Sequence, residues 1–193
     1  MTVKAVLKND TKVVTGKVRL SYANIFEPRS INGSEPKYSV SLIIPKDDTQ
    51  QLEVIRQAIE NAKESDKHKW GGKIPANLKL PLRDGDLERP DDEAYENSYF
   101  INANSTRPPV VVGTKIDRAT GKAIRLGEDE VYSGCYARVS IDFYGFNAAG
   151  NKGIACGLGN IQKIADGERL GGGSTAEEDF EFEVVDVDDD FLA

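Results

Sequence analysis

The side chains with the clearest chemistry in this sequence are aromatic and basic, and they alternate along residues 130–146. One parity is apolar and includes Val131, Cys135 and Phe143. The other parity reads Tyr132, Tyr136, Arg138, Ser140, Asp142, Tyr144 and Phe146. Alternate side chains of a strand share a face, and aromatic rings stack on bases while Arg neutralises phosphates. The pattern indicates a surface for single-stranded nucleic acid. The alternative is a second small core of tyrosines, covered by the segment 70–97.

Two loops carry further aromatic and basic side chains. Phe26 and Arg29 lie in "NIFEPRSINGSEPK", which is either a finger that closes over a bound strand or a simple hairpin connection. Trp70 follows three cationic residues. It is either an exposed ring on which a base stacks or an anchor that packs on the core. The residue types alone leave both alternatives open.

Catalytic chemistry needs a constellation that is not evident in this sequence. His68 is the single histidine, and neither Cys135 nor Cys156 has an evident base partner, so a thiol nucleophile is not indicated. Neither "GGK" nor "TGK" has the spacing of a P-loop. We therefore expect no enzyme activity, no catalytic residue, no metal and no cofactor. A weaker alternative is an Mg²⁺-dependent nuclease whose ligands would be Asp84, Asp86, Asp91 and Asp92.

Charge divides the chain into a mildly basic body and an acidic end. The net charge is −7, yet residues 174–193 contain no Lys or Arg and nine Asp or Glu, so residues 1–173 hold 25 basic and 23 acidic residues. This asymmetry is typical of nucleic-acid proteins with an acidic arm. A solubility tail would not explain Phe180, Phe182, Phe191 and Leu192. No apolar run approaches the roughly 20 residues of a membrane span, and the two cysteines read as reduced core thiols of an intracellular protein.

Most of the chain before residue 165 is patterned as strands. Strands are predicted near residues 14–24, 37–45, 98–106, 108–113, 130–146 and 153–164, with a hairpin tip at 117–122. Val18, Leu20 and Tyr22 are expected to share an inward face, and so are Tyr38, Val40, Leu42 and Ile44. A single helix should begin at Asp47 or Asp48 and end between Glu64 and Lys67. The fold class is mainly β, a five-stranded antiparallel barrel with one helix and long loops.

A glycine-rich stretch, "ADGERLGGGST", marks the end of this body. We expect a domain at 1–165, a hinge at 166–175 and a disordered acidic tail at 176–193.

Several stretches together resemble a known family. "YANIFEPRSINGSEPKYSVSLIIPK", "LPLRDGD" and "YFINANSTRPP" are similar to a phage and prophage family once filed as a domain of unknown function. That family is assigned to OB-fold single-stranded DNA-binding proteins, similar in plan to those of short-tailed coliphages. The resemblance covers about residues 12–165. It also includes the plan of an acidic C-terminal tail with an aromatic residue near its end.

The resemblance implies non-sequence-specific single-stranded DNA binding, in phage replication, recombination or repair, without catalysis. The positions that fit a DNA-binding role are Lys17, Arg19, Phe26, Arg29, Lys37, Trp70, Arg107, Tyr136, Arg138 and Tyr144. A phage structural or adaptor protein that binds no nucleic acid is the alternative.

In the family, the acidic tail is thought to contact replication proteins, such as a polymerase or helicase-primase of phage or host, and to compete with DNA. The docking residues would be Asp188, Asp189, Asp190, Phe191 and Leu192, although this chain carries two residues beyond the phenylalanine. The expected location is the cytoplasm of a bacterial host, with no membrane partner. A homodimer remains an open alternative.

Overall fold

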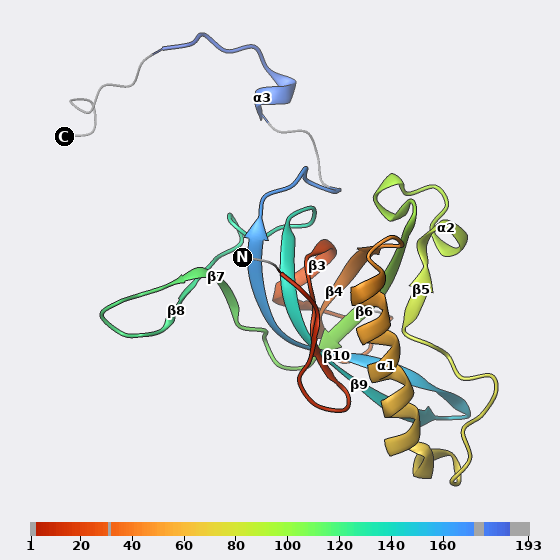
Figure 1. The fold of residues 1–193 in the computed structure, drawn as a ribbon. Coiled ribbons are helices and arrows are strands. Elements are labelled where there is room, and N and C mark those ends of the chain that lie inside the picture. Colours follow the sequence, from red (N-terminus) through yellow and green to blue (C-terminus); the bar gives the residue numbers. More distant parts are fainter. Residues whose placement is uncertain (1–2, 31, 172–175, 186–193) are drawn as a thin grey trace.

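The structure is a computed structural model that describes residues 3–30, 32–171 and 176–185, without the side chains of 177 and 178. Its elements are labelled in Figure 1. The strands are β1 (Val6–Leu7), β2 (Lys12–Val14), β3 (Val18–Arg29), β4 (Lys37–Pro45), β5 (Leu82–Asp84), β6 (Ser98–Ser105), β7 (Val111–Ile116), β8 (Ala123–Arg125), β9 (Tyr136–Ala148) and β10 (Asn151–Ala165). The helices are α1 (Thr49–Ser65), α2 (Gly85–Glu88) and α3 (Ala176–Asp179), with 3₁₀ turns η1 (Lys67–Trp70) and η2 (Glu93–Tyr95). Within these described ranges, no helix is long and apolar enough to cross a bilayer.

Five long strands close a barrel. β3 pairs with β4 and β9, β4 pairs with β6, and β10 joins β6 to β9. These pairs are antiparallel except β6–β10, where Gly157 lies beside Asn104 in a parallel arrangement. A closed five-stranded barrel with this connectivity is an OB-fold. The predicted OB-fold barrel is confirmed, and the parallel pair is its departure from an all-antiparallel sheet.

The long helix covers one side of the barrel. Asp48 caps it, because its carboxylate accepts a hydrogen bond from the Gln51 backbone N–H at 3.3 Å. Leu52, Ile55 and Ile59 form its buried face, which packs mainly on β9 and on the β1–β2 hairpin. The predicted helix and its start are therefore confirmed.

Strand β3 changes its phase half-way along. Val18 and Leu20 are buried as predicted, but the pairing of β3 with β4 shifts register between Ser21 and Asn24. Tyr22 adopts a φ of +46° at this bulge, and its side chain is 56% exposed. Beyond the bulge Ile25 takes the inward position. The prediction that Tyr22 lies in the core was wrong, since a bulge exchanges the two faces of a strand.

The irregular segment between α1 and β6 is anchored in two places. At one end Trp70 is 7% exposed and its Nε1–H donates to the Phe146 carbonyl at 3.0 Å. At the other end Tyr95 is fully buried and meets the Phe100 ring edge-on, at 5.1 Å between centroids, in a small core that includes Ile43. This second core covers one end of the outer face of β4 and β6.

Residues 166–170 remain on the barrel after β10 ends, and we call them the strap. The strap backbone accepts a hydrogen bond from Arg19, and the Leu170 N–H donates to the Ser133 carbonyl at 2.9 Å. The Leu170 side chain packs on the small core around Tyr95. The strap is the first part of the hinge predicted at 166–175, and the contacts of Glu168 and Leu170 run to the body.

Strands β7 and β8 form a hairpin that projects from the body (Figure 1). We call residues 111–125 the arm. β7 joins the barrel through Val111 and Val112, which pair in parallel with Ile161 and Gln162 of β10. Gly121 at the tip has a φ of +69°, which confirms the predicted turn.

Candidate nucleic-acid interface

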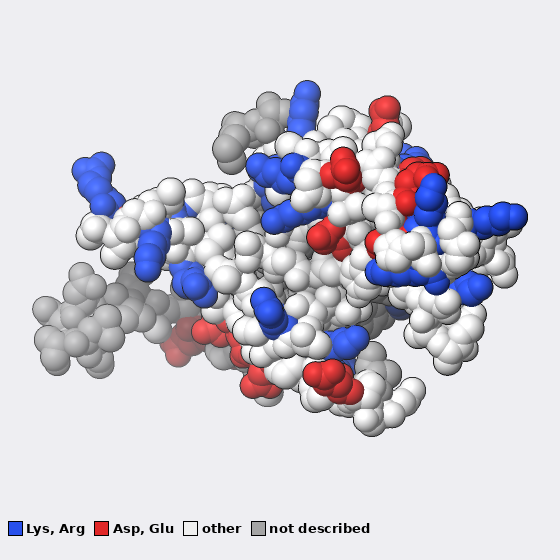
Figure 2. Space-filling view, turned by 90° about the horizontal axis from the view of Figure 1, so that it is seen from below, with Lys and Arg blue, Asp and Glu red and all other residues white. Residues whose placement is uncertain are grey.

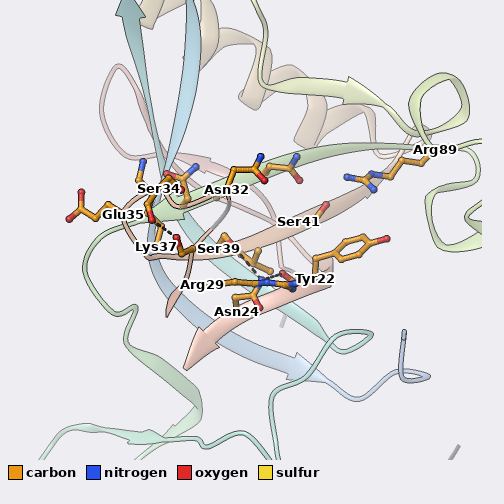
Figure 3. Close-up of a pocket in the computed structure, with 15 residues that line it drawn as sticks. Tyr22, Asn24, Arg29, Asn32, Ser34, Glu35, Lys37, Ser39, Ser41 and Arg89 are labelled. Carbon is orange, nitrogen blue, oxygen red and sulfur yellow. Dashed lines mark hydrogen bonds between the residues drawn. The ribbon is translucent and has the colours of Figure 1, made fainter. Parts of the chain in front are cut away.

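A groove of about 580 Å³ runs over the outer face of β3, β4 and β6, and Figure 3 shows the residues that line it. The pairing of β4 with β6 explains why this face is polar. Ser39 lies opposite Asn104, and Ser41 lies opposite Asn102. The alternate pairs, such as Leu42 with Ile101, point into the core. The strand alternation therefore builds an apolar interior and a neutral, hydrogen-bonding floor from the same two strands.

Cations stand at both ends of this floor. Arg29 and Lys37 are Cα partners at the far ends of β3 and β4, beside the connecting loop. Arg89, from the segment after α2, lines the opposite end with Tyr22 (Figure 3). Glu35 is the single carboxylate among the described lining residues. On the face drawn in Figure 2, Lys and Arg side chains lie around a largely uncharged middle, with Asp and Glu side chains among them.

The Arg89 side chain is held among aromatic rings. Its Cζ lies 5.1 Å from the centroids of Tyr22, Tyr95 and Phe100. Its Nε is buried and has no hydrogen-bond partner among the described residues. Tyr95 also fixes the groove floor, because its hydroxyl lies 2.9 Å from Ser41 Oγ. Arg89 is thus positioned by stacking, and its terminal amino groups, not the buried Nε, are the donors it can offer to an anion at the groove.

Tyr144 is separated from the groove floor by strand β10. It stands on the outer face of β9, and its Cε1 is 3.7 Å from where a Cβ on Gly157 of β10 would lie. Gly157 is the Cα partner of Asn104, which lines the groove. The Tyr144 ring is 41% exposed, and partial burial raises the pKa of its hydroxyl, which therefore stays protonated at neutral pH. The two exposed tyrosines, Tyr22 and Tyr144, flank the floor from different strands.

Comparison with known proteins decides the family. A family model described as "Enterobacter phage Enc34, ssDNA-binding protein" matches residues 11–192. The chain belongs to this phage single-stranded DNA-binding protein family.

Two relatives illustrate the match. "Putative protein p50" of Acyrthosiphon pisum secondary endosymbiont phage 1 is 32% identical over 94% of this chain and 99% of its own length. The single-stranded DNA-binding protein of bacteriophage Enc34, solved in complex with single-stranded DNA, superimposes with a TM-score of 0.72 at 26% identity. That match covers 88% of this chain and 98% of the other. The gp2.5 protein of bacteriophage T7, at 15% identity and a TM-score of 0.57 over 92% of this chain and 98% of the other, shares the fold.

Three of the DNA-binding residues predicted for this family member meet at a second place, under the strap. Lys17 Nζ lies 4.9 Å and Arg19 Cζ lies 5.7 Å from the Tyr136 ring centroid. The Arg19 guanidinium is engaged by the backbone, because it donates hydrogen bonds to the carbonyls of Gly134 and Glu168 at 3.1 and 2.8 Å. A Cβ on Gly167 of the strap would lie 2.9 Å from the Tyr136 ring. The sequence left open that the tyrosines of this face are covered and not free to stack on bases. Tyr136 is covered in this way, by the strap and not by residues 70–97.

Arg138 holds the N-terminal segment. Its guanidinium donates to the carbonyls of Thr15 and Lys4, both at 3.0 Å. This arrangement gives the side chain a structural role on β9, away from the groove lining.

The structure separates the predicted loop residues. Arg107 is exposed two residues beyond Ser105, whose Cα partner is Tyr38, so it stands at the Lys37 end of the groove. Phe26 is half-buried and packs against the core. Trp70 is a correction: because its ring is buried, it anchors the loop and offers no stacking surface. Asp188 to Leu192 lie outside the described residues, so the tail prediction stays a prediction.

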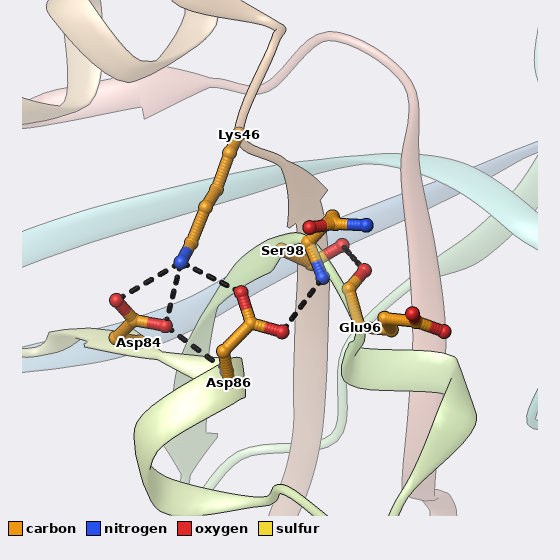
Figure 4. Close-up of polar contacts among 6 residues, drawn as sticks. Lys46, Asp84, Asp86, Glu96 and Ser98 are labelled. Atoms are coloured by element: carbon orange, nitrogen blue, oxygen red, sulfur yellow. Dashed lines mark hydrogen bonds and ion pairs between the residues drawn. The ribbon is translucent and has the colours of Figure 1, made fainter.

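The acidic segment proposed for a nuclease has structural partners instead (Figure 4). Lys46 Nζ lies 2.9 Å from an Asp84 oxygen and 2.8 Å from Asp86 Oδ2. This ammonium group lowers the pKa of both carboxyl groups. Asp86 also accepts the Asn97 N–H, and Asp92 caps η2 by accepting the Ala94 N–H. Among the described residues, no three His, Cys, Asp or Glu side chains gather as a metal site.

Sequence reasoning missed several groove residues. For Asn102 and Asn104 a signal existed, because they alternate with Ile101 and Ala103 in the same way as the serines of β4. For Tyr22 the signal was a break in the alternation: Val18 and Leu20 lie at even-numbered positions, whereas the apolar Ile25 lies at an odd-numbered one. Arg89 sits in an aperiodic segment, where no sequence signal places it at the groove.

Proposed function

We propose that this protein binds single-stranded DNA without sequence preference, in the groove on β3, β4 and β6. The observation that carries the proposal is a neutral hydrogen-bonding floor with exposed Tyr22 and the cations Arg29, Lys37 and Arg89 at its two ends. The strand face of an OB-fold, together with its connecting loops, is where oligonucleotides bind. The Enc34 relative solved with single-stranded DNA supports the same assignment.

The groove suits unpaired DNA for three physical reasons. Tyr22 and Tyr144 offer rings on which bases of any sequence stack. The three cations neutralise phosphates and release counterions, which gives a salt-dependent affinity. The serine and asparagine side chains of the floor hydrogen-bond to bases or sugars without adding charge. Binding then favours the unpaired state by mass action, without ATP and without catalysis.

The biological role that follows is the coating of exposed strands during phage DNA replication, recombination or repair, in the cytoplasm of the bacterial host. A coated strand is shielded from nucleases and cannot fold into hairpins.

The acidic C-terminal segment would serve this role in two ways. We infer that Asp188 to Leu192 dock on partner replication proteins, with the carboxylates steering the terminal apolar side chains to basic pockets. We also infer that the segment competes with DNA. The strap that leads to this segment ends at Leu170, beside Tyr22 and Arg89, in a depression that Glu88, Asp91, Asp92 and Glu93 also line. The competition would therefore act at the other groove cations, Arg29 and Lys37. Deleting residues 174–193 should therefore tighten DNA binding at low salt. Unchanged or weaker binding would contradict the competition.

The proposal is tested by titrating the full-length protein into fluorescent poly-dT and into a matched duplex at two salt concentrations. We expect tight binding to the single strand, weakened by salt, and little binding to the duplex. The absence of a single-strand preference would refute the proposal and favour a structural or adaptor protein. Mg²⁺-dependent shortening of the strand would favour the nuclease alternative.

A further inference from the structure

The arm carries a concentration of positive charge that the groove does not use. Lys115, Arg118, Lys122 and Arg125 are all exposed within eleven residues. The single carboxylate in this stretch, Asp117, is occupied at the turn, where its Oδ1 accepts the Ala119 N–H at 2.9 Å. The arm thus has a local net charge of about +3 on a chain whose total is −7.

The fold does not neutralise these charges. Elsewhere in the described part of the chain, six lysine and arginine side chains pair with carboxylates: Lys46, Lys63, Lys67, Lys69, Arg83 and Lys163. None of the four arm cations has a carboxylate within 4 Å among the described residues. Like charges crowded on one hairpin repel one another, so their placement costs stability unless an anion compensates it.

The arm also exposes apolar side chains. Ile116 is 67% exposed at the end of β7, and Ile124 is 45% exposed on β8. Because the hairpin projects from the barrel (Figure 1), its outer half has no core against which these side chains could pack. A ligand that combines anionic and apolar parts would satisfy both features, and a nucleic-acid strand is such a ligand.

The topology places the arm in line with the groove. β6, whose Asn102 and Asn104 form the floor, runs parallel to β10 at Gly157. β7 runs parallel to the same strand four residues further on, at Ile161. β7 therefore continues in the direction of β6, and Arg107 lies between them at the end where Lys37 stands. A DNA strand that leaves the groove at this end meets the arm next.

We propose that the arm is a second contact site for the phosphate backbone of single-stranded DNA that leaves the groove past Arg107. This inference rests on the proposed function and extends its footprint beyond the groove. At about 3.3 Å per residue, the six residues of β7 reach about 20 Å. Lys115, Arg118 and Lys122 lie at the outer end of the arm, and Arg125 lies at its base opposite Val112, so a strand that follows the arm meets cations at both ends.

The test compares two variants of the full-length protein. The arm variant carries Lys115→Gln, Arg118→Gln, Lys122→Gln and Arg125→Gln. The control removes four exposed lysines that do not line the groove, by Lys4→Gln, Lys8→Gln, Lys12→Gln and Lys73→Gln. Because an OB-fold covers about 4–16 nucleotides, each protein is titrated with a dT strand of about 6 nucleotides and with one of about 24. Circular dichroism and thermal melting verify that both variants are folded.

On the long strand, the slope of log K against log salt should fall by up to about 2.8 in the arm variant, since each lost phosphate contact removes about 0.7. On the short strand the two variants should behave alike. An arm variant that matches the control on both strands would overturn the inference. A tighter long-strand complex would also overturn it, because the cations would then be holding an acidic peptide such as residues 177–183. If the unsubstituted protein binds neither strand, the proposed function itself fails.

Discussion

The exposed ring of Tyr22 offers the sharpest test of which face binds DNA. The substitution Tyr22→Ala removes a side chain that is 56% exposed and lines the groove. Its ring contacts the Arg89 guanidinium, whose Cζ lies 5.1 Å from the ring centroid. The change should therefore leave the free energy of unfolding within about 1 kcal/mol of the original value, which is the scale of an exposed cation–π contact.

The expected effect on binding is much larger. Stacking of one base on an aromatic ring is worth about 1–3 kcal/mol, and each 1.4 kcal/mol is a tenfold change in affinity. Tyr22→Ala should thus weaken poly-dT binding by roughly 5- to 140-fold. Tyr22→Phe, which retains the ring, should bind within about twofold of the original protein. Fluorescence anisotropy with labelled poly-dT at fixed salt measures all three proteins.

Tyr136→Ala is the matched control, because this tyrosine lies under Lys17, Arg19 and the strap instead of in the groove. It should weaken DNA binding far less than Tyr22→Ala. If Tyr136→Ala costs more affinity than Tyr22→Ala, the binding face is the one at the start of β9, and the assignment of the groove is refuted.

Three further substitutions separate structural from binding roles. Arg138→Ala removes two hydrogen bonds to N-terminal carbonyls. It should lower stability by about 1–3 kcal/mol in urea unfolding, with an unchanged salt slope of DNA binding; a flatter slope would place it on phosphate. Trp70→Phe orphans a backbone carbonyl and should also cost about 1–3 kcal/mol, without changing poly-dT affinity; a loss of affinity in a folded variant would contradict the anchor role. Lys46→Met should change how the stability of the fold depends on pH. Its two carboxylate partners have pKa values below the ordinary 3.8 in the folded protein, so their pairing stabilises the fold above about pH 4 and is lost as the pH falls through the lowered values. Stability of the original protein should fall more steeply below pH 4 than that of the variant, and parallel curves would exclude the pairing as a source of stability.

Much of the scaffold could be predicted because burial imposes a period on the sequence. Val40 and Leu42 alternate with Ser39 and Ser41, and this pattern identified the inner face and the polar part of the outer face of β4. The helix was found from its capping Asp48 and apolar spacing. The closure of the barrel came from the family resemblance, since the parallel contact between β6 and β10 leaves no local trace in either strand.

The site could be predicted only in part, for reasons visible in single residues. Lys37 and Arg29, both predicted from the sequence, line the groove because they lie on or beside regularly alternating strands. Tyr22 was misplaced because a backbone bulge, which has no fixed sequence signature, reverses the parity it would otherwise have. Arg138 and Arg19 were read as free cations, yet backbone carbonyls from distant segments engage them. Side-chain type gives the chemistry, whereas long-range hydrogen bonding decides which cations remain free.

The bulge in β3 has a consequence for how this sequence can vary. The residues before it and after it obey opposite parities, so β3 works as two short strands joined at Ser21 to Asn24. Substitutions at the exposed Tyr22 remove little buried surface, but β-branched residues and proline do not fit its φ of +46°. Deletion of Ala23 or Asn24 would instead put both halves in phase, so that Leu20 and Ile25 stay inward and Tyr22 turns inward as well. We therefore expect related sequences to differ in side chain here while conserving the length of this segment, and an alignment gap between residues 21 and 24 would mark a protein with a different groove.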